Sequence, residues 1–377
     1  TILCRKPRII ENVITENRYP SRVVERLTCF KEEIVAGAVK PLTENAADVE
    51  EWNTTWLQFR GRTWLNLSWY FAEAYFYRRL LEAVEYFQPG PLEGVDPFST
   101  SKREQLRESI TPLSLVVDPM GKIKDPQLCF ENLLHACLWG NRVDLSNLTV
   151  TEEVRRRQGM IERENLLIDD SPKVIQVFLR CPPPQIAFIN DNVGIELGFD
   201  LCLADFLLRN NWVEKITFFL KPYPFFVSDA IPKDLLETVQ ALAGASVSSL
   251  RLLGVRLRDD LASGRLSLSG ERFWASPYHF CEMPNSLLEK ISRFDLMVSK
   301  GDVNYRRLLS DRHWPYTTPI EEIVNYFPTS LLILRTLKGE IIVGLNPGQA
   351  EEIEAEDPAW LINGKRGLIQ YIECTSL

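Results

Sequence analysis

Apolar residues follow a helical period through much of the first part of the chain. Between Trp64 and Phe87 they recur at spacings of three and four, which predicts a helix with an apolar and a polar face. A second helix is predicted over Pro126 to Leu138, because a Gly-Asn stop follows it closely. We therefore expect residues 1–165 to form a helical N-terminal domain.

The pattern changes after a helix that begins at Asp170-Ser171-Pro172 and ends near Leu179. From Gln185 onwards, short apolar runs alternate with longer helical patterns, which is typical of βαβ units. The predicted strands are Ile186 to Asn190, Lys215 to Leu220, Ser249 to Leu253, Phe294 to Ser299 and Leu331 to Arg335. The predicted helices are Ile195 to Asn210, Lys233 to Ala243, Pro284 to Ile291 and Tyr305 to Leu309. We expect residues 166–377 to form an α/β domain around a largely parallel sheet.

Two C-terminal segments have simpler interpretations. Taken alone, Arg335 to Gly339 is interpreted as a hairpin turn that leads into Glu340 to Leu345. The acidic run Glu351 to Asp357 is interpreted as a solvated loop rather than a site.

Composition limits the class of protein and its partners. The chain has 377 residues, of which 45% are hydrophobic and 25% charged, as in ordinary globular proteins. Its net charge of -8 argues against nucleic acid or an anionic membrane as a partner. The apolar runs are shorter than the roughly 20 residues of a membrane-spanning helix. Eight scattered cysteines without a Cys-x-x-Cys pair predict buried free thiols, so we expect a soluble cytoplasmic protein.

Polar residues directly after predicted strands are the first candidates for chemistry, because ligands bind beyond the carboxyl ends of parallel strands. Asp191 and Asn192 follow one strand and lead into a glycine turn at Gly194. Their oxygen atoms suit Mg²⁺ or Mn²⁺, although such residues also serve as turns or helix caps. Asp229 follows the next strand after an aromatic run, and it becomes a metal ligand only if it meets Asp191 in space.

A third strand end is rich in charge. Lys300 and Gly301 form a turn that could hold a phosphate group, and Asp302, Asn304 and Arg306 follow directly. After the last predicted strand, two more cations follow at Arg335 and Lys338.

Other kinds of active site have little support. The three histidines lack metal-binding spacing, and the sequence has no Gly-x-Ser-x-Gly, Walker A or Gly-x-Gly-x-x-Gly motif. The aromatic residues between Trp52 and Tyr77 could line a pocket, but core packing is the simpler interpretation.

The strand-end motifs, in this order, resemble the metal-dependent damage-control phosphatases, a family once catalogued only as domain of unknown function 89. Further resemblance lies in the helical half, so the likeness covers nearly the whole chain. The final motif is similar to that of the third subfamily. The motifs are Asp191-Asn192-x-Gly194-x-Glu196, Val227-Ser228-Asp229, Lys300-Gly301-Asp302-x-Asn304-Tyr305-Arg306, Arg335-Thr336-x-Lys338, Trp69-x-x-x-Glu73-x-Tyr75-x-Tyr77-Arg78-Arg79 and Leu138-Trp139-Gly140-Asn141-x-x-Asp144-Leu145-Ser146.

The resemblance implies a Rossmann-like α/β/α sandwich with a helical N-terminal domain. It implies a divalent metal, Mn²⁺, Mg²⁺, Co²⁺ or Ni²⁺, held by Asp191, Asn192 and Asp229, which are also the candidate catalytic residues. It further implies hydrolysis of small phosphate esters, with fructose 1-phosphate and fructose 6-phosphate as examples. The candidate substrate-binding residues are Glu196, Lys300, Asp302, Asn304, Arg306, Arg335, Lys338 and Asn141.

Three functions remain open at this point. The first is metal-dependent phosphate-ester hydrolysis, in which Asp191 is either the nucleophile or the residue that orients a water molecule. The second is methyl transfer from S-adenosylmethionine to a protein carboxylate, which rests on a description of one member of the resembling subfamily. The third is a metabolite-binding protein without catalysis.

Overall fold

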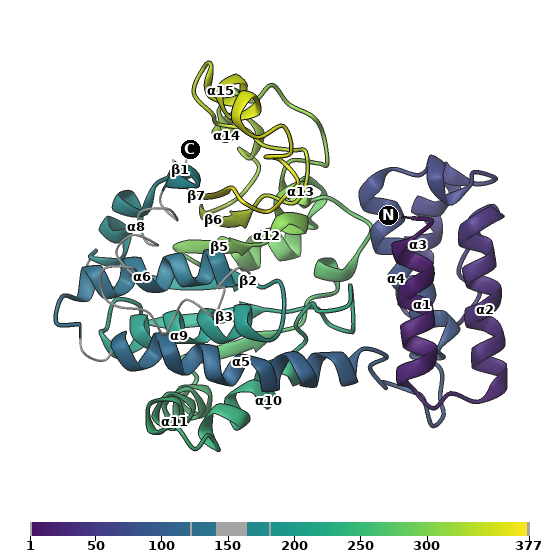
Figure 1. Ribbon diagram of the computed structural model, residues 1–377, viewed down its shortest axis with the longest axis horizontal. Coiled ribbons are helices and arrows are strands. Elements are labelled where there is room, and N and C mark those ends of the chain that lie inside the picture. The colour runs from purple at the N-terminus through teal and green to yellow at the C-terminus, as the bar shows by residue number, and fades with distance from the viewer. Residues whose placement is uncertain (1, 121–122, 141–163, 181, 375–377) are drawn as a thin grey trace.

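The strands of the computed structural model form one sheet in the order β1-β7-β6-β5-β2-β3-β4 (Figure 1). The structure describes residues 2–120, 123–140, 164–180 and 182–374. Neighbouring strands run parallel except for β6 and β7, which are antiparallel. The strands are β1 (Leu166–Asp169), β2 (Gln185–Ile189), β3 (Lys215–Phe219), β4 (Leu266–Ser269), β5 (Leu296–Lys300), β6 (Ser330–Thr336) and β7 (Gly367–Ile372).

The strand order reverses between β2 and β5. From β2 the chain builds outward through β3 and β4, whereas β5 and β6 are added on the other side. The two central strands are in register, from Ile186 opposite Leu296 to Ile189 opposite Ser299. Because connections leave in opposite directions at such a point, a crevice opens beyond the carboxyl ends of the two strands. The loops after β2 and β5 therefore meet at the place where α/β proteins bind ligands.

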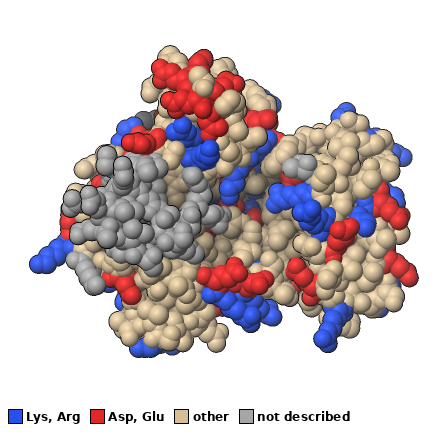
Figure 2. All heavy atoms as spheres, viewed as in Figure 1, with Lys and Arg blue, Asp and Glu red and all other residues tan. Residues whose placement is uncertain are grey.

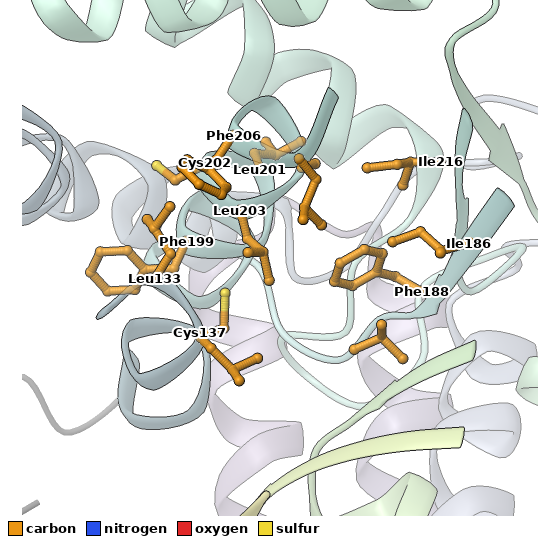
Figure 3. Packing of buried hydrophobic residues seen from close by; sticks show 14 of the residues in the cluster. Leu133, Cys137, Ile186, Phe188, Phe199, Leu201, Cys202, Leu203, Phe206 and Ile216 are labelled. Atoms are coloured by element: carbon orange, nitrogen blue, oxygen red, sulfur yellow. The ribbon is translucent and has the colours of Figure 1, made fainter. Parts of the chain in front are cut away.

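Side chains of the sheet alternate between two apolar cores. Ile186 and Phe188 of β2 belong to the first core, and Ala187 and Ile189 belong to the second. Figure 3 shows part of the first core, where labelled side chains from β2, β3 and two helices gather between the helices and the sheet. Burial on both faces makes the sheet the middle layer of a sandwich.

Helices cover both faces of the sheet. The first core is closed by α5 (Ser99–Met120), α6 (Pro126–Trp139), α8 (Ser171–Phe178), α9 (Ile195–Arg209), α10 (Pro232–Ala243) and α11 (Ser248–Ser263). The second is closed by η5 (Arg272–Ala275), η6 (Phe280–Glu282), α12 (Asn285–Ile291), α13 (Asp302–Leu308), α14 (Ile320–Ile323) and α15 (Gln349–Glu356). The predicted fold class, an α/β/α sandwich with a largely parallel sheet, is confirmed.

The first four helices form a separate group at one end of the molecule, which we call the helical unit (Figure 1). It has its own apolar core, which also takes in Tyr223, Phe225 and Phe226 from the loop after β3. The contact with this loop joins the unit to the edge of the sheet where the candidate residues lie. The unit consists of α1 (Arg5–Glu16), α2 (Ser21–Ala36), α3 (Val49–Trp56), η1 (Leu57–Phe59), η2 (Trp64–Asn66) and α4 (Trp69–Ala83).

Helix α4 differs from the helix predicted over Trp64 to Phe87. The chain forms the short η2 first, and α4 begins only after Ser68. Nearly all of its residues are buried, because its charged side chains are paired inside the unit rather than turned to solvent. The polar residues predicted for this helix are present, but they are buried inside the unit.

Four of the five predicted strands are confirmed within a residue or two, but the prediction of a strand over Ser249 to Leu253 was wrong, because this segment lies in α11. A short apolar run does not distinguish a strand from a buried helical turn. The partner of β6 is β7, and no strand occupies Glu340 to Leu345. Most of the acidic run Glu351 to Asp357 is helical, in α15.

Helices α5 and α6 both pack on α9, and so they belong to the layer that covers the sheet. The domain boundary at residue 165 stays a prediction about folding units. Seven described cysteines are free, but Cys4, Cys29 and Cys281 are exposed, so the expectation of buried thiols holds only in part. Among the residues that the structure describes, no helix is both long and apolar enough to span a membrane.

Candidate active site

A cavity of about 320 Å³ opens beyond the carboxyl ends of β2, β5 and β6. In Figure 2 the face of the molecule turned to the viewer is hollowed between the helical unit and the sheet, with basic and acidic atoms on both sides of the hollow. Much of the predicted site meets in the cavity. The predicted residues that line it are Asp191, Asn192, Glu196, Asp229, Lys300, Asp302 and Lys338.

Backbone hydrogen bonds hold the loops after β2 and β3 together. The amide of Val193 donates to Ser228 O at 2.7 Å, and the amide of Ala230 donates to Asp191 O at 2.9 Å. Asn192 and Asp229 form an isolated antiparallel bridge between these bonds. The condition that the sequence left open, a meeting of Asp229 with Asp191, is therefore fulfilled.

Glycine at position 301 lets the loop after β5 approach the Asp191 side chain. Its φ is +87°, and a Cβ atom there would lie 2.0 Å from Asp191 Oδ2. Any other residue would displace the carboxylate. The close approach of backbone to side chain therefore explains the glycine in this turn.

The carboxylates in the cavity raise one another's pKa. Burial raises the pKa of Asp191 well above its ordinary value, and the charges of Glu196 and Asp229 raise it further. Burial also raises the pKa of Asp229 to about 6, although the charges of Lys221 and Lys102 oppose this. A divalent cation between such groups would relieve their repulsion and restore the ionised forms.

Asp191 and Asp229 fit a divalent metal by the chemistry of their oxygen donors. All three predicted ligands already have protein partners. The amide oxygen of Asn192 accepts a hydrogen bond from Ser228 Oγ at 2.6 Å, its Nδ2 atom donates to Asp191 Oδ2 at 3.0 Å, and Asp229 Oδ2 lies 3.5 Å from Lys221 Nζ. No group of three or more His, Cys, Asp or Glu side chains in the described ranges is arranged to hold a metal. The predicted metal ligands include only two side chains of these types, the carboxylates of Asp191 and Asp229. The third predicted ligand is the amide of Asn192.

Lys300 lines the cavity, and its ammonium group already has partners within the protein. Its side chain is 3% exposed, its Nζ atom lies 2.8 Å from Asp200 Oδ1, and it also donates to the carbonyl of Cys137. Burial lowers the pKa of Lys300, but the charge and hydrogen bond of Asp200, together with the charges of Cys137 and Glu196, outweigh this effect, and the net shift is upward. Lys300 therefore brings a permanent positive charge to the floor of the cavity.

Three predicted substrate-binding residues lie behind the cavity lining. Arg335 is 0% exposed and donates to Asp302 Oδ1 at 2.8 Å and to the carbonyl of Gly339. Asn304 donates to the carbonyl of Lys300 at 2.8 Å. Arg306 donates to Asp311 Oδ1 at 2.7 Å. In this structure these donor groups are bound to the protein and shape the loops that carry the lining residues, whereas the buried Oδ1 atom of Asn304 has no hydrogen-bond partner among the described residues.

Among the cations that follow the strands of the sheet, Lys338 is available to a ligand. Its side chain is exposed in the cavity, and in the described part of the chain no carboxylate forms an ion pair with it. Its charge lowers the pKa values of Asp191 and Glu196, so it lies on the side of the cavity where the carboxylates gather. Asn141 lies outside the described residues.

The sequence analysis missed residues on the opposite side of the cavity. The sequence analysis quoted Trp69 and Glu73 only as part of a family-like motif, and it preferred core packing for the aromatic residues of this segment. The contribution of Arg5, Trp69 and Glu73 depends on how the helical unit packs, whereas Gln105 lies on α5. Asp200 was also missed, although it follows Glu196 by one turn of α9 and a search along that helix face would have found it. The missed lining residues are Arg5, Trp69, Glu73 and Gln105.

The fold and the cavity define an α/β sandwich protein with a charged ligand site at the switch point of its sheet. The family model described as the damage-control phosphatase ARMT1-like domain matches residues 1–353. The chain belongs to this family, and the resemblance seen in the sequence is confirmed. Its class is therefore that of the phosphatases.

Two relatives that bear a phosphatase name agree with this assignment. A protein of Mus musculus named damage-control phosphatase ARMT1 is 30% identical, over 98% of this chain and 95% of its own length. The protein of that name in Danio rerio is 32% identical, over 88% of this chain and 81% of its own length. The crystal structure of a DUF89 family protein from Pyrococcus horikoshii covers 99% of this chain and 96% of its own, at 16% identity and a TM-score of 0.49. The methyl-transfer alternative gains no support from these names.

Proposed function

We propose that this chain is a metal-dependent phosphomonoesterase that hydrolyses small sugar phosphates such as fructose 1-phosphate and fructose 6-phosphate. The observation that carries the proposal is one cavity that joins two mutually repelling carboxylates, Asp191 and Asp229, to the unpaired cation Lys338. The carboxylates suit a divalent ion, and the ammonium group suits the phosphate of an ester. The relatives that bear a phosphatase name agree with this chemistry.

We assign roles to the residues of the chain as follows. Asp191 and Asp229, with Asn192, would hold Mn²⁺, Mg²⁺, Co²⁺ or Ni²⁺, and the chemistry that such an ion supplies is polarisation of a phosphoryl oxygen. Lys338 binds a second phosphoryl oxygen, and Lys300 contributes a positive potential at the floor of the cavity. Asp191 either attacks phosphorus itself or orients the attacking water.

Glu196 and Asp302 complete the polar lining near the phosphate. Asn192 Nδ2 donates to Glu196 Oε2 at 3.1 Å, which holds the Glu196 side chain beside the predicted metal ligands. Asp302 is held by Arg335 and also accepts from the backbone amide of Lys338 at 3.4 Å. Both carboxylates can accept hydrogen bonds from hydroxyl groups of a sugar.

The test is phosphate release by the full chain from a panel of sugar phosphates. Chelation should stop release, and Mn²⁺, Mg²⁺, Co²⁺ or Ni²⁺, restored one at a time, should bring it back and rank both metals and substrates. Lys338→Ala should lower kcat/KM by about 100-fold, because a preorganised cation at a phosphoryl group contributes that much. The matched control is Lys215→Ala, an exposed lysine at the start of β3 far from the cavity lining. Silence of the wild type with every metal and ester would reject the proposal.

A further inference from the structure

The helical unit supplies one wall of the cavity. Arg5 begins α1, and Trp69 and Glu73 lie one turn apart on α4. All three line the same cavity as Asp191 and Lys338. This wall is made by residues more than a hundred positions away from the metal site in sequence.

Lys6 fixes the start of α1 against α4. Its side chain is fully buried, it pairs with Glu73, and its Nζ atom lies 4.5 Å from the ring centroids of both Phe76 and Tyr77. The preceding residue, Arg5, is therefore held at the cavity by a neighbour that cannot move freely. Arg5 itself is exposed, and none of the described residues forms an ion pair or a hydrogen bond with it.

Arg5 and Lys338 line the same cavity from different parts of the fold. Lys338 follows β6 of the sheet, whereas Arg5 is the first residue of α1 in the helical unit. Because one cavity holds both cations, an ester whose phosphate lies at Lys338 can place its remaining atoms against the wall that carries Arg5.

The chemistry of the wall suits a chain of hydroxyl groups. A guanidinium group only donates hydrogen bonds, and a carboxylate only accepts them. Trp69 adds a half-buried indole ring, which is held in place because the Arg306 guanidinium lies 3.8 Å from its centroid. Donor, acceptor and a fixed aromatic surface together recognise the hydroxyl groups and C–H faces of a sugar.

We propose that Arg5, Trp69 and Glu73 form the binding wall for the polyhydroxylated leaving group, and that Arg5 determines specificity for esters long enough to reach it. The inference rests on the proposed phosphatase activity and adds the group that selects among its substrates. Arg5 is a binding residue and takes no part in cleavage of the P–O bond.

The test compares Arg5→Ala with the matched control Arg8→Ala, which removes the same charge from an exposed position of the same helix outside the cavity lining. Each variant is assayed on fructose 1-phosphate and on ethyl phosphate, which has the phosphate but no hydroxyl groups. Arg5→Ala should lower kcat/KM for the sugar ester by about tenfold, mainly through KM, because one charged hydrogen bond is lost. Its kcat/KM for ethyl phosphate should change by less than about twofold, and Arg8→Ala should leave both esters unaffected.

If the wild type is active, two outcomes overturn the inference. An equal loss on both esters would place Arg5 at the phosphate, and no loss on either would remove it from binding. If the wild type hydrolyses neither ester, the proposed function fails, and calorimetric binding of fructose 1-phosphate then decides this inference separately. Weaker binding by Arg5→Ala alone would support the wall, whereas equal or absent binding by all three proteins would reject it.

Discussion

The helical unit and the cavity both bury charged side chains, but they balance the charges differently. In the helical unit, Arg78 donates to the two oxygens of Asp48 at 2.7 and 2.8 Å. Burial raises the pKa of Asp48, but the bonds and charge of Arg78, together with the hydrogen bond from Tyr223, outweigh this effect, and the net shift is downward. In the cavity, Lys221 and Lys338 offset only part of the rise in the pKa of Asp191.

The difference separates structural charges from functional ones. A buried charge that is fully paired stabilises the fold only as long as both partners remain. A buried carboxylate with too little positive charge around it costs stability, and it offers a place for a ligand's charge. We therefore expect substitutions in the two regions to affect activity and stability in opposite ways.

The largest expected effect comes from Asp191→Asn. The substitution removes a charge that the proposed metal needs, so kcat/KM for the best sugar phosphate should fall by about 1,000-fold or more. The free energy of unfolding should stay level or rise by about 1 kcal/mol, because a repelling carboxylate is gone. Phosphate release and urea denaturation measure the two quantities.

The control for this variant is Asp205→Asn on α9. Asp205 binds Arg256 through two hydrogen bonds of 2.6 and 2.7 Å and does not line the cavity, so its loss should leave kcat/KM unchanged while stability falls. Turnover that survives in Asp191→Asn, or a loss of stability in both variants alike, would contradict the distinction between the two regions.

Asp48→Asn tests the comparison in the helical unit, where we expect stability to fall and activity to remain. Arg78 would keep its charge in a buried position with one carboxylate fewer, which costs about 3–5 kcal/mol of stability. Per folded molecule, kcat/KM should stay close to that of the wild type, because Asp48 does not line the cavity. Urea denaturation gives the first quantity, and phosphate release below the unfolding transition gives the second. An unchanged stability would show that the ion pair contributes nothing.

The same contrast explains what the sequence can predict. Asp191, Asp229 and Lys338 were predictable as a group because each follows a strand, and the carboxyl ends of parallel strands meet at one edge of a sheet. The strand itself is recognisable from four or five apolar residues. For this side of the cavity, local pattern and topology together are sufficient to locate the residues.

The other side of the cavity could not be predicted in this way. Arg5 and Trp69 reach the site only because the helical unit packs its core against Phe225 and Phe226, and no repeat or spacing encodes that contact. The position of a charged residue after a strand also does not show whether its side chain points into the cavity or into the protein. Arg335 follows β6, yet its guanidinium turns inward to Asp302.

The smallest expected effect is a pH dependence of stability in the helical unit. Arg78 holds the pKa of Asp48 below its ordinary value of 3.8 in the folded chain. The Asp48 contribution to stability is therefore fully present above that ordinary value and is lost as the pH falls through the folded pKa. Urea midpoints recorded from about pH 5 downwards should fall more steeply for the wild type than for Asp48→Asn, because only the wild type has this carboxylate to protonate. If the urea midpoints of the two proteins fell equally with pH, Arg78 would interact with Asp48 by shape and hydrogen bonding rather than by charge. The contrast between the helical unit and the cavity would then rest on Asp191 alone.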